Sequence, residues 1–123
     1  MVEDQDKDKE ETRVREIPVQ LVDMFSYPTV LEMIRGPDSP RNMVLDKDEL
    51  LVGRGSNADL QIDSLDLSRL HFSLTHRGTD WILQDLESAN GVFLNGLKIY
   101  SAVLHNGDRL QVGDILLVFH EGA

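Results

Sequence analysis

The chain has 123 residues, a length typical of one domain with room for a tail. Its 22 acidic and 12 basic residues give a net charge of −10, which argues against binding to duplex nucleic acid or to an anionic membrane surface. No cysteine is present, so disulfides, thiolate metal sites and a cysteine nucleophile are excluded. The start has no apolar signal region and no apolar run reaches about 18 residues, so we expect a cytoplasmic protein without membrane insertion.

The first part of the chain is rich in charge and poor in apolar residues. Residues 1–16 hold seven acids and four bases, and their only aliphatic side chains are Val2 and Val14. Such a composition cannot offset the conformational entropy that ordering costs. We therefore predict a disordered, flexible acidic tail over residues 1–16.

A short apolar pattern follows the tail. Ile17, Leu21, Met24 and Phe25 fall at i, i+4, i+7 and i+8, which is one face of a short helix. Residues 17–27 are therefore predicted to be a short amphipathic or linker segment. This segment either packs on the folded domain or docks on a partner.

After Pro28 the pattern changes to short apolar or alternating runs separated by turn signals. Three Asn-Gly pairs, at 90–91, 95–96 and 106–107, favour turns because these residues tolerate positive φ angles. Many short strands at this spacing indicate an all-β sandwich or barrel over residues 28–123. The predicted strands span residues 29–34, 43–45, 50–52, 60–62, 72–75, 81–85, 92–94, 98–102, 109–112 and 115–119.

The polar residues of the predicted loops do not form a catalytic or metal-binding pattern. Ser68 and His71 could be a nucleophile and its base, but a spacing of three residues leading into a strand points the two side chains to opposite faces. Neither a Gly-x-Ser-x-Gly motif nor a phosphate-binding P-loop motif occurs. The four histidines show no ligand-like spacing. We predict no enzyme activity, no metal and no cofactor.

The same loops suit the binding of a phosphorylated peptide. Arg54 stands between two glycines, and an arginine can grip a phosphate with two parallel hydrogen bonds. Ser68 offers a hydroxyl, Arg69 a second positive charge and Asn90 an amide with donors and an acceptor. Each residue alone has an ordinary structural explanation. Together they could hold a phosphate and the backbone of the peptide that carries it.

These motifs, with this spacing and order, closely resemble the forkhead-associated (FHA) domain over about residues 28–120. The resemblance rests on Gly53-Arg54-Gly55-Ser56, Leu67-Ser68-Arg69-Leu70-His71, Ser88-Ala89-Asn90-Gly91 and Asn95-Gly96. It implies an FHA-type β-sandwich of about eleven strands, which binds phosphothreonine peptides through loops at one end and is not an enzyme. Arg54 would then pair with the phosphate and Ser68 would donate a hydrogen bond to it. Arg69 would contact the phosphate or peptide backbone, and Asn90 would bind the ligand's main chain.

Other positions would support the site or tune it. The resemblance implies structural roles for Gly53, for His71, which would brace the arginine-bearing loop, and for Asn95 in a turn. Ala89 departs from the family, which often has a threonine or another polar residue there, so one hydroxyl contact is lost. Asp66, in the loop before the serine, predicts that acidic residues C-terminal to the phosphothreonine are disfavoured.

The resemblance also implies the biological setting. We expect a monomeric phosphothreonine-binding module in signalling by a Ser/Thr kinase, with a phosphothreonine-containing protein as its partner. Thr12 in the acidic tail is a possible phosphoacceptor, and the layout resembles small bacterial FHA regulators whose phosphorylated tail binds their own domain. Those regulators carry a Thr-Thr pair that this chain lacks. The alternative is an FHA-like domain that assembles a complex without phosphate.

Overall fold

The computed structural model of the chain describes residues 27–122, which form eleven β-strands and no helix. The predicted all-β fold with about eleven strands is therefore confirmed. The predicted tail, Thr12 and all of the predicted amphipathic segment except Tyr27 lie outside the described residues.

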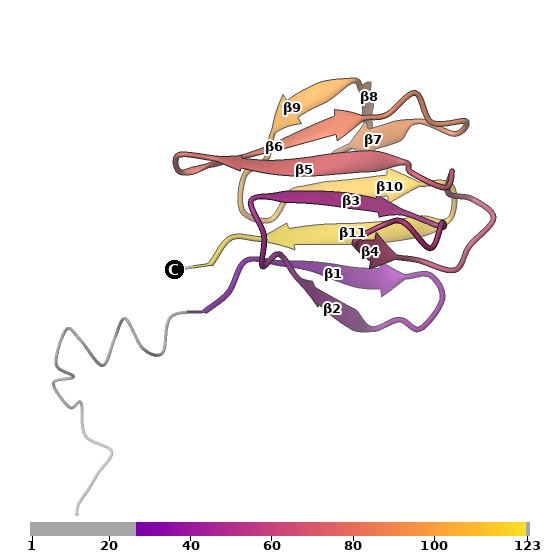
Figure 1. Cartoon of the computed structure of the whole chain (residues 1–123), viewed down its shortest axis with the longest axis horizontal. Helices are drawn as coiled ribbons and strands as arrows, with labels where there is room; N and C mark the ends of the chain where they lie inside the picture. Colours follow the sequence, from indigo (N-terminus) through magenta and orange to yellow (C-terminus); the bar gives the residue numbers. More distant parts are fainter. Residues whose placement is uncertain (1–26, 123) are drawn as a thin grey trace, which may run out of the picture.

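The strands form two sheets that pack face to face (Figure 1). Both sheets are antiparallel except for the short parallel pair β3–β4. In spatial order, the six-stranded sheet contains β2 (Arg41–Val44), β1 (Val30–Arg35), β11 (Ile115–His120), β10 (Arg109–Val112), β7 (Val92–Leu94) and β8 (Leu97–Ile99). The five-stranded sheet contains β4 (Leu60–Gln61), β3 (Glu49–Gly53), β5 (Phe72–Arg77), β6 (Asp80–Asp85) and β9 (Ser101–Val103).

The core lies between the two sheets and follows from the alternation of side chains along each strand. In β10, Leu110 and Val112 are buried, whereas Arg109 and Gln111 are exposed. The six-stranded sheet contributes Leu31, Met33, Leu110, Val112, Ile115, Leu117 and Phe119 to this core. The five-stranded sheet contributes Leu50, Val52, Phe72, Leu74, Trp81 and Leu83.

The prediction of one strand over residues 98–102 is wrong. The chain forms two strands there, β8 and β9, and they belong to different sheets. Between them stands Tyr100, which is 74% exposed and whose carbonyl accepts a hydrogen bond from the Asp85 amide at 2.8 Å. The chain crosses from one layer to the other at this residue. A continuous run of strand-forming residues gives no local sign of such a crossing.

Of the three Asn-Gly pairs, only Asn95–Gly96 adopts positive φ at both residues, 49° and 89°. It closes the β7–β8 hairpin, in which Leu94 pairs with Leu97. The two other pairs connect strands of different sheets, and only their glycines have positive φ.

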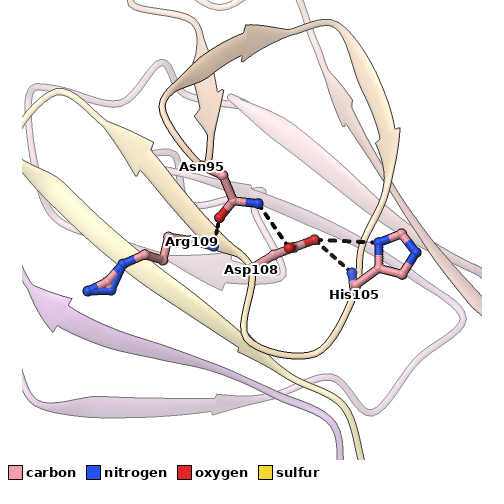
Figure 2. A network of polar contacts seen from close by, with 4 residues as sticks. All are labelled: Asn95, His105, Asp108 and Arg109. Atoms are coloured by element: carbon pink, nitrogen blue, oxygen red, sulfur yellow. Dashed lines mark hydrogen bonds and ion pairs between the residues drawn. The ribbon is translucent and has the colours of Figure 1, made fainter.

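The Asn95 side chain also joins its turn to the start of β10, as Figure 2 shows. Its Oδ1 accepts a hydrogen bond from the Arg109 amide at 2.9 Å, and its Nδ2 donates to Asp108 Oδ1 at 3.0 Å. The other carboxylate oxygen of Asp108 accepts from the His105 amide at 2.7 Å. Asn95 thus holds together the β7–β8 turn and the turn that leads into β10.

Candidate functional site

Three loops meet at one end of the sandwich, opposite the end where the C-terminus lies (Figure 1). They are the β3–β4 loop (residues 54–59), the β4–β5 loop (residues 62–71) and the β6–β7 loop (residues 86–91). The register explains their meeting, because Phe72 at the start of β5 pairs with Val52 near the end of β3 and with Asp85 at the end of β6. One end of the fold therefore carries all four predicted ligand-binding residues: Arg54, Ser68, Arg69 and Asn90.

Arg54 is half-buried, and hydrogen bonds to the β4–β5 loop orient its guanidinium. Its Nε donates a hydrogen bond to the Leu67 carbonyl at 3.0 Å, and its amide donates to the Ser68 carbonyl at 3.0 Å. A guanidinium has five N–H donors, and within residues 27–122 only Nε is bonded, so both Nη groups are available to a ligand. The arginine is thus fixed beside the serine before any ligand arrives.

Glycine is required at position 53 by the close approach of two main chains. A Cβ atom built there would overlap the carbonyl oxygen of Arg69, and it would lie 2.9 Å from the Leu70 Cα atom. The same Arg69 carbonyl accepts a hydrogen bond from the Gly55 amide at 3.0 Å. The main chain of Arg69 therefore joins two loops, while its side chain is exposed and free to reach a ligand.

Ser68 has its hydroxyl oxygen held and its hydroxyl proton free. Ser68 Oγ accepts a hydrogen bond from the Ala89 amide at 3.0 Å, so its O–H can donate to a ligand. Ala89 lacks the hydroxyl that is frequent in the family, but its main-chain N–H still orients the serine.

His71 is fully buried and lies behind the site. Its Nδ1 accepts a hydrogen bond from the Ser68 amide at 2.9 Å, and its Nε2 lies 2.9 Å from the Gly91 carbonyl oxygen. The neutral ring with the proton on Nε2 satisfies both partners. The ring therefore ties the β4–β5 loop to the β6–β7 loop. The contact of His71 with β3 is made by its main chain, whose amide donates a hydrogen bond to the Val52 carbonyl at 2.8 Å. Since Nδ1 contacts the serine amide and not the hydroxyl, this pair is not arranged as a nucleophile and its base.

Asn90 is exposed at the rim of the same end. Its Nδ2 donates a hydrogen bond to the Asp66 carbonyl at 2.7 Å, which leaves Oδ1 and one amide hydrogen for a ligand. The Asp66 carboxylate accepts from the Asp114 amide in the β10–β11 turn at 2.9 Å. No local pattern in the chain indicates that Asp66 joins the asparagine to this fourth segment.

Lys98 is a further cation at this end that the sequence pattern did not single out. The carbon next to its ammonium lies 2.9 Å from where a Cβ on Gly91 would stand, so its stem covers the loop just after Asn90. The sequence feature that could have identified Lys98 is the Asn95–Gly96 turn, because a two-residue hairpin places Lys98 opposite Phe93.

The far end of the arginine-bearing loop is held by Asp59. Its carboxylate accepts a hydrogen bond from the Leu51 amide at 2.8 Å and another from Lys47 Nζ at 3.0 Å. The amide hydrogen bond first, and then the lysine, hold the pKa of the Asp59 carboxyl below its usual range. The hydrogen bond to the same carboxylate raises the pKa of Lys47.

Other kinds of site find no support in the part of the chain that the structure describes. Residues 27–122 contain no group of three histidine, aspartate or glutamate side chains placed to hold a metal ion. No helix among them is long and apolar enough to span a bilayer. A hollow of about 520 Å³ is lined by Tyr27, Asp48 and Trp81 among others, and by none of Arg54, Ser68, Arg69 and Asn90.

Comparison with known proteins identifies the family. Residues 50–113 match the FHA domain. The chain is 33% identical to the oxoglutarate dehydrogenase inhibitor of Corynebacterium jeikeium over 94 residues, which are 76% of this chain and 65% of that protein. It is 34% identical to the glycogen accumulation regulator GarA of Mycolicibacterium smegmatis over 97 residues, 79% of this chain and 61% of that protein.

A solved structure shows the same fold. Mycobacterium tuberculosis EmbR, in complex with a low-affinity phosphopeptide, superposes with a TM-score of 0.72 at 27% identity over 85% of this chain and 29% of EmbR. The matched part of this chain spans less than two thirds of the length of each of the two curated relatives named above. These two relatives are named as an inhibitor and a regulator. The chain belongs to the FHA domain family.

Proposed function

We propose that the loop end of the sandwich binds a phosphothreonine-containing segment of a protein in Ser/Thr kinase signalling. One observation carries this proposal: Arg54 and Ser68 are adjacent, and the hydrogen bonds that hold them within residues 27–122 do not use the Arg54 Nη groups or the Ser68 hydroxyl proton. A phosphate carries about −1.5 to −2 charges near neutral pH and has three acceptor oxygens. The guanidinium would bind two of these oxygens and the serine hydroxyl would bind one.

The expected selectivity for phosphate follows from these donors. A hydrogen bond to a charged group contributes roughly 1.5–3 kcal/mol. Arg54 and Ser68 together would therefore separate phosphorylated from unphosphorylated peptide by about a hundredfold or more. Arg69 adds charge beside them, and Asn90 would hold the peptide main chain through its free Oδ1. The choice of phosphothreonine as the phosphorylated residue rests on the family resemblance.

The test is titration calorimetry with a phosphothreonine peptide. We expect Arg54→Ala to abolish measurable binding, because neither free Nη group remains, while the thermal midpoint changes little. Arg77→Ala is the matched control, since Arg77 is exposed at the end of β5 that points away from these loops. Unchanged affinity in Arg54→Ala would refute the assignment of the site. Capture of a partner that survives phosphatase treatment would instead support phosphate-independent assembly.

Further parts of the proposal concern the setting. A Ser/Thr kinase would act upstream, and since such kinases use cytoplasmic ATP we propose a cytoplasmic, monomeric and non-catalytic protein. The ligand would be a partner protein or the chain's own tail phosphorylated on Thr12. Nuclear magnetic resonance shifts of the site loops, recorded with and without phosphate on Thr12, would distinguish the tail from a separate partner.

A further inference from the structure

The outer face of the six-stranded sheet carries a row of side chains that leads away from the proposed phosphate site. The strand register places these residues side by side across five strands, because directly paired residues point to the same face. In order across the sheet they are Arg35, Leu116, Gln111, Phe93 and Lys98. Neighbouring strands are about 4.8 Å apart, so the row is ~19 Å long.

Two adjoining hollows follow this row. The first has a volume of about 410 Å³ and is lined by Asn90, Phe93, Gly96, Gln111 and Gly113. The second has a volume of about 370 Å³ and is lined by Arg35, Asn95, Gly96, Arg109, Gln111 and Leu116. They share Gly96 and Gln111, so they form one groove. Since Asn90 lines the first hollow, the groove begins at the proposed ligand site.

Three cations lie along the groove in an otherwise acidic chain, while the Asp66 carboxylate lies against Gly113 at the first hollow. Arg35 and Arg109 line the groove, and Lys98 stands at the end of the row beside Phe93. Within residues 27–122, none of these three cations has a carboxylate oxygen within 4.0 Å. Figure 2 shows the Arg109 side chain pointing away from Asp108. The Asp108 carboxylate accepts hydrogen bonds from Asn95 Nδ2 and the His105 amide instead.

Apolar side chains alternate with these charges. Phe93 and Leu116 are half-buried on the outer face, where no other part of the described chain covers them. Glu32 is on the same face, but its carboxylate contacts His120 Nε2 at 2.7 Å and, among residues 27–122, lies more than 4.0 Å from the three cations. The groove therefore suits a ligand that combines negative charge with apolar side chains.

We propose that this groove, which we call the outer-face groove, binds an acidic and apolar extension of the phosphorylated partner segment. The inference rests on the proposed function, since the extension would be continuous with the phosphothreonine held at the loops. At about 3.3 Å per residue, an extended segment of about five or six residues fills the row. Its acidic side chains would meet Arg35, Arg109 and Lys98, and its apolar side chains would cover Phe93 and Leu116.

The experiment compares short and extended phosphothreonine peptides by titration calorimetry. The short peptide has two neutral residues on each side of the phosphothreonine. Two longer peptides add about five residues of alternating glutamate and leucine, one before and one after the short sequence. Two more carry serine in place of each glutamate. We expect one acidic extension to increase the affinity about tenfold, because several exposed ion pairs add to one apolar contact. The gain should shrink at high salt. The proposal is overturned if neither acidic extension binds more tightly than its serine counterpart.

Charge reversal in the groove tests the location. Arg109→Glu should remove the gain from the acidic extension while the affinity for the short peptide stays unchanged. The turn network survives this substitution because it uses only the main chain of residue 109. Arg77→Glu, the same change at an exposed position outside the groove, should leave the gain intact. Equal effects of the two reversals would overturn the proposal, since they would show only a long-range charge effect.

Two further measurements separate this inference from the proposed function. If the short phosphopeptide binds but no extension adds affinity, the function stands and the groove assignment fails. If no phosphopeptide binds, amide shifts in β7 and β10 on titration with the unphosphorylated glutamate–leucine segment would still support the groove, and their absence would overturn it. Dimerisation of the chain that Arg109→Glu abolishes would also overturn it, by showing that a second copy covers this face.

Discussion

Replacing His71 by phenylalanine should destabilise the domain and loosen its ligand-binding end together. The ring is fully buried and contacts the Ser68 amide and the Gly91 carbonyl, both at 2.9 Å. Phenylalanine has a similar shape but no nitrogen, so both buried groups lose their partners. Each unsatisfied group costs about 1–3 kcal/mol, which gives a loss of about 2–6 kcal/mol. Domains of this size have only about 5–15 kcal/mol of stability, so the variant should unfold readily.

The assay is urea unfolding followed by the fluorescence of Trp81, the single tryptophan, which is buried in the core. With a mid-range slope of about 2 kcal/mol per molar urea, the expected loss lowers the midpoint by about 1–3 M. The affinity for a phosphothreonine peptide should fall as well, because the ring ties the loop of Ser68 to the loop of Asn90. His105→Phe, at a side chain that is 80% exposed, is the control and should unfold like the wild type.

The reasoning is refuted if His71→Phe stays within about 0.5 kcal/mol of the wild type, the range of ordinary surface substitutions. His71→Gln gives an intermediate check. Glutamine keeps one acceptor and one donor at this position, so its loss of stability should be smaller than that of phenylalanine. An equal loss in both variants would point to packing, not to the two hydrogen bonds, as the role of the ring.

Two other substitutions test the loops around Arg54. Gly53→Ala should lower the free energy of unfolding in urea by about 2–4 kcal/mol, because its methyl group pushes the Arg69 main chain away. Gly78→Ala, with open space around it, should lower it by only ~1 kcal/mol. Equal losses in the two variants would contradict this account. Because the pKa of Asp59 is lowered in the folded chain, its carboxylate stabilises the fold at pH values above the usual carboxyl pKa. This stabilisation is lost as the pH falls through the pKa of the folded state. The difference in urea midpoint between wild type and Asp59→Asn should therefore shrink below about pH 4, and a constant difference would count against it.

Periodicity in the sequence predicted most of the strands because each strand presents one face to the core. Nine of the ten predicted runs overlap one strand each, and only the run over 98–102 was wrong, where the chain changes sheet at Tyr100. The positive φ angles of Asn95 and Gly96 also agree with the local turn signal. The other two Asn-Gly pairs show the limit of this local turn signal, because the same dipeptide there connects strands of different sheets.

For the candidate site, local sequence determined which side chains are available and tertiary structure decided what each of them can do. The motifs named Arg54, Ser68, Arg69 and Asn90, since each motif is a short continuous segment. The strand register brought them to one end, and their hydrogen bonds with Leu67, Ala89 and Asp66 decided which donors stay available.

The acidic composition by itself argued against general binding of polyanions, but it could not show where the few cations lie. Only the pairing of β1, β11, β10, β7 and β8 places Arg35 and Lys98 in one row on the outer face. These two residues are far apart in the sequence, and no pattern within a single strand relates them. Contacts between distant segments depend on sheet order and register, which the chain fixes only when the core between its two sheets is packed.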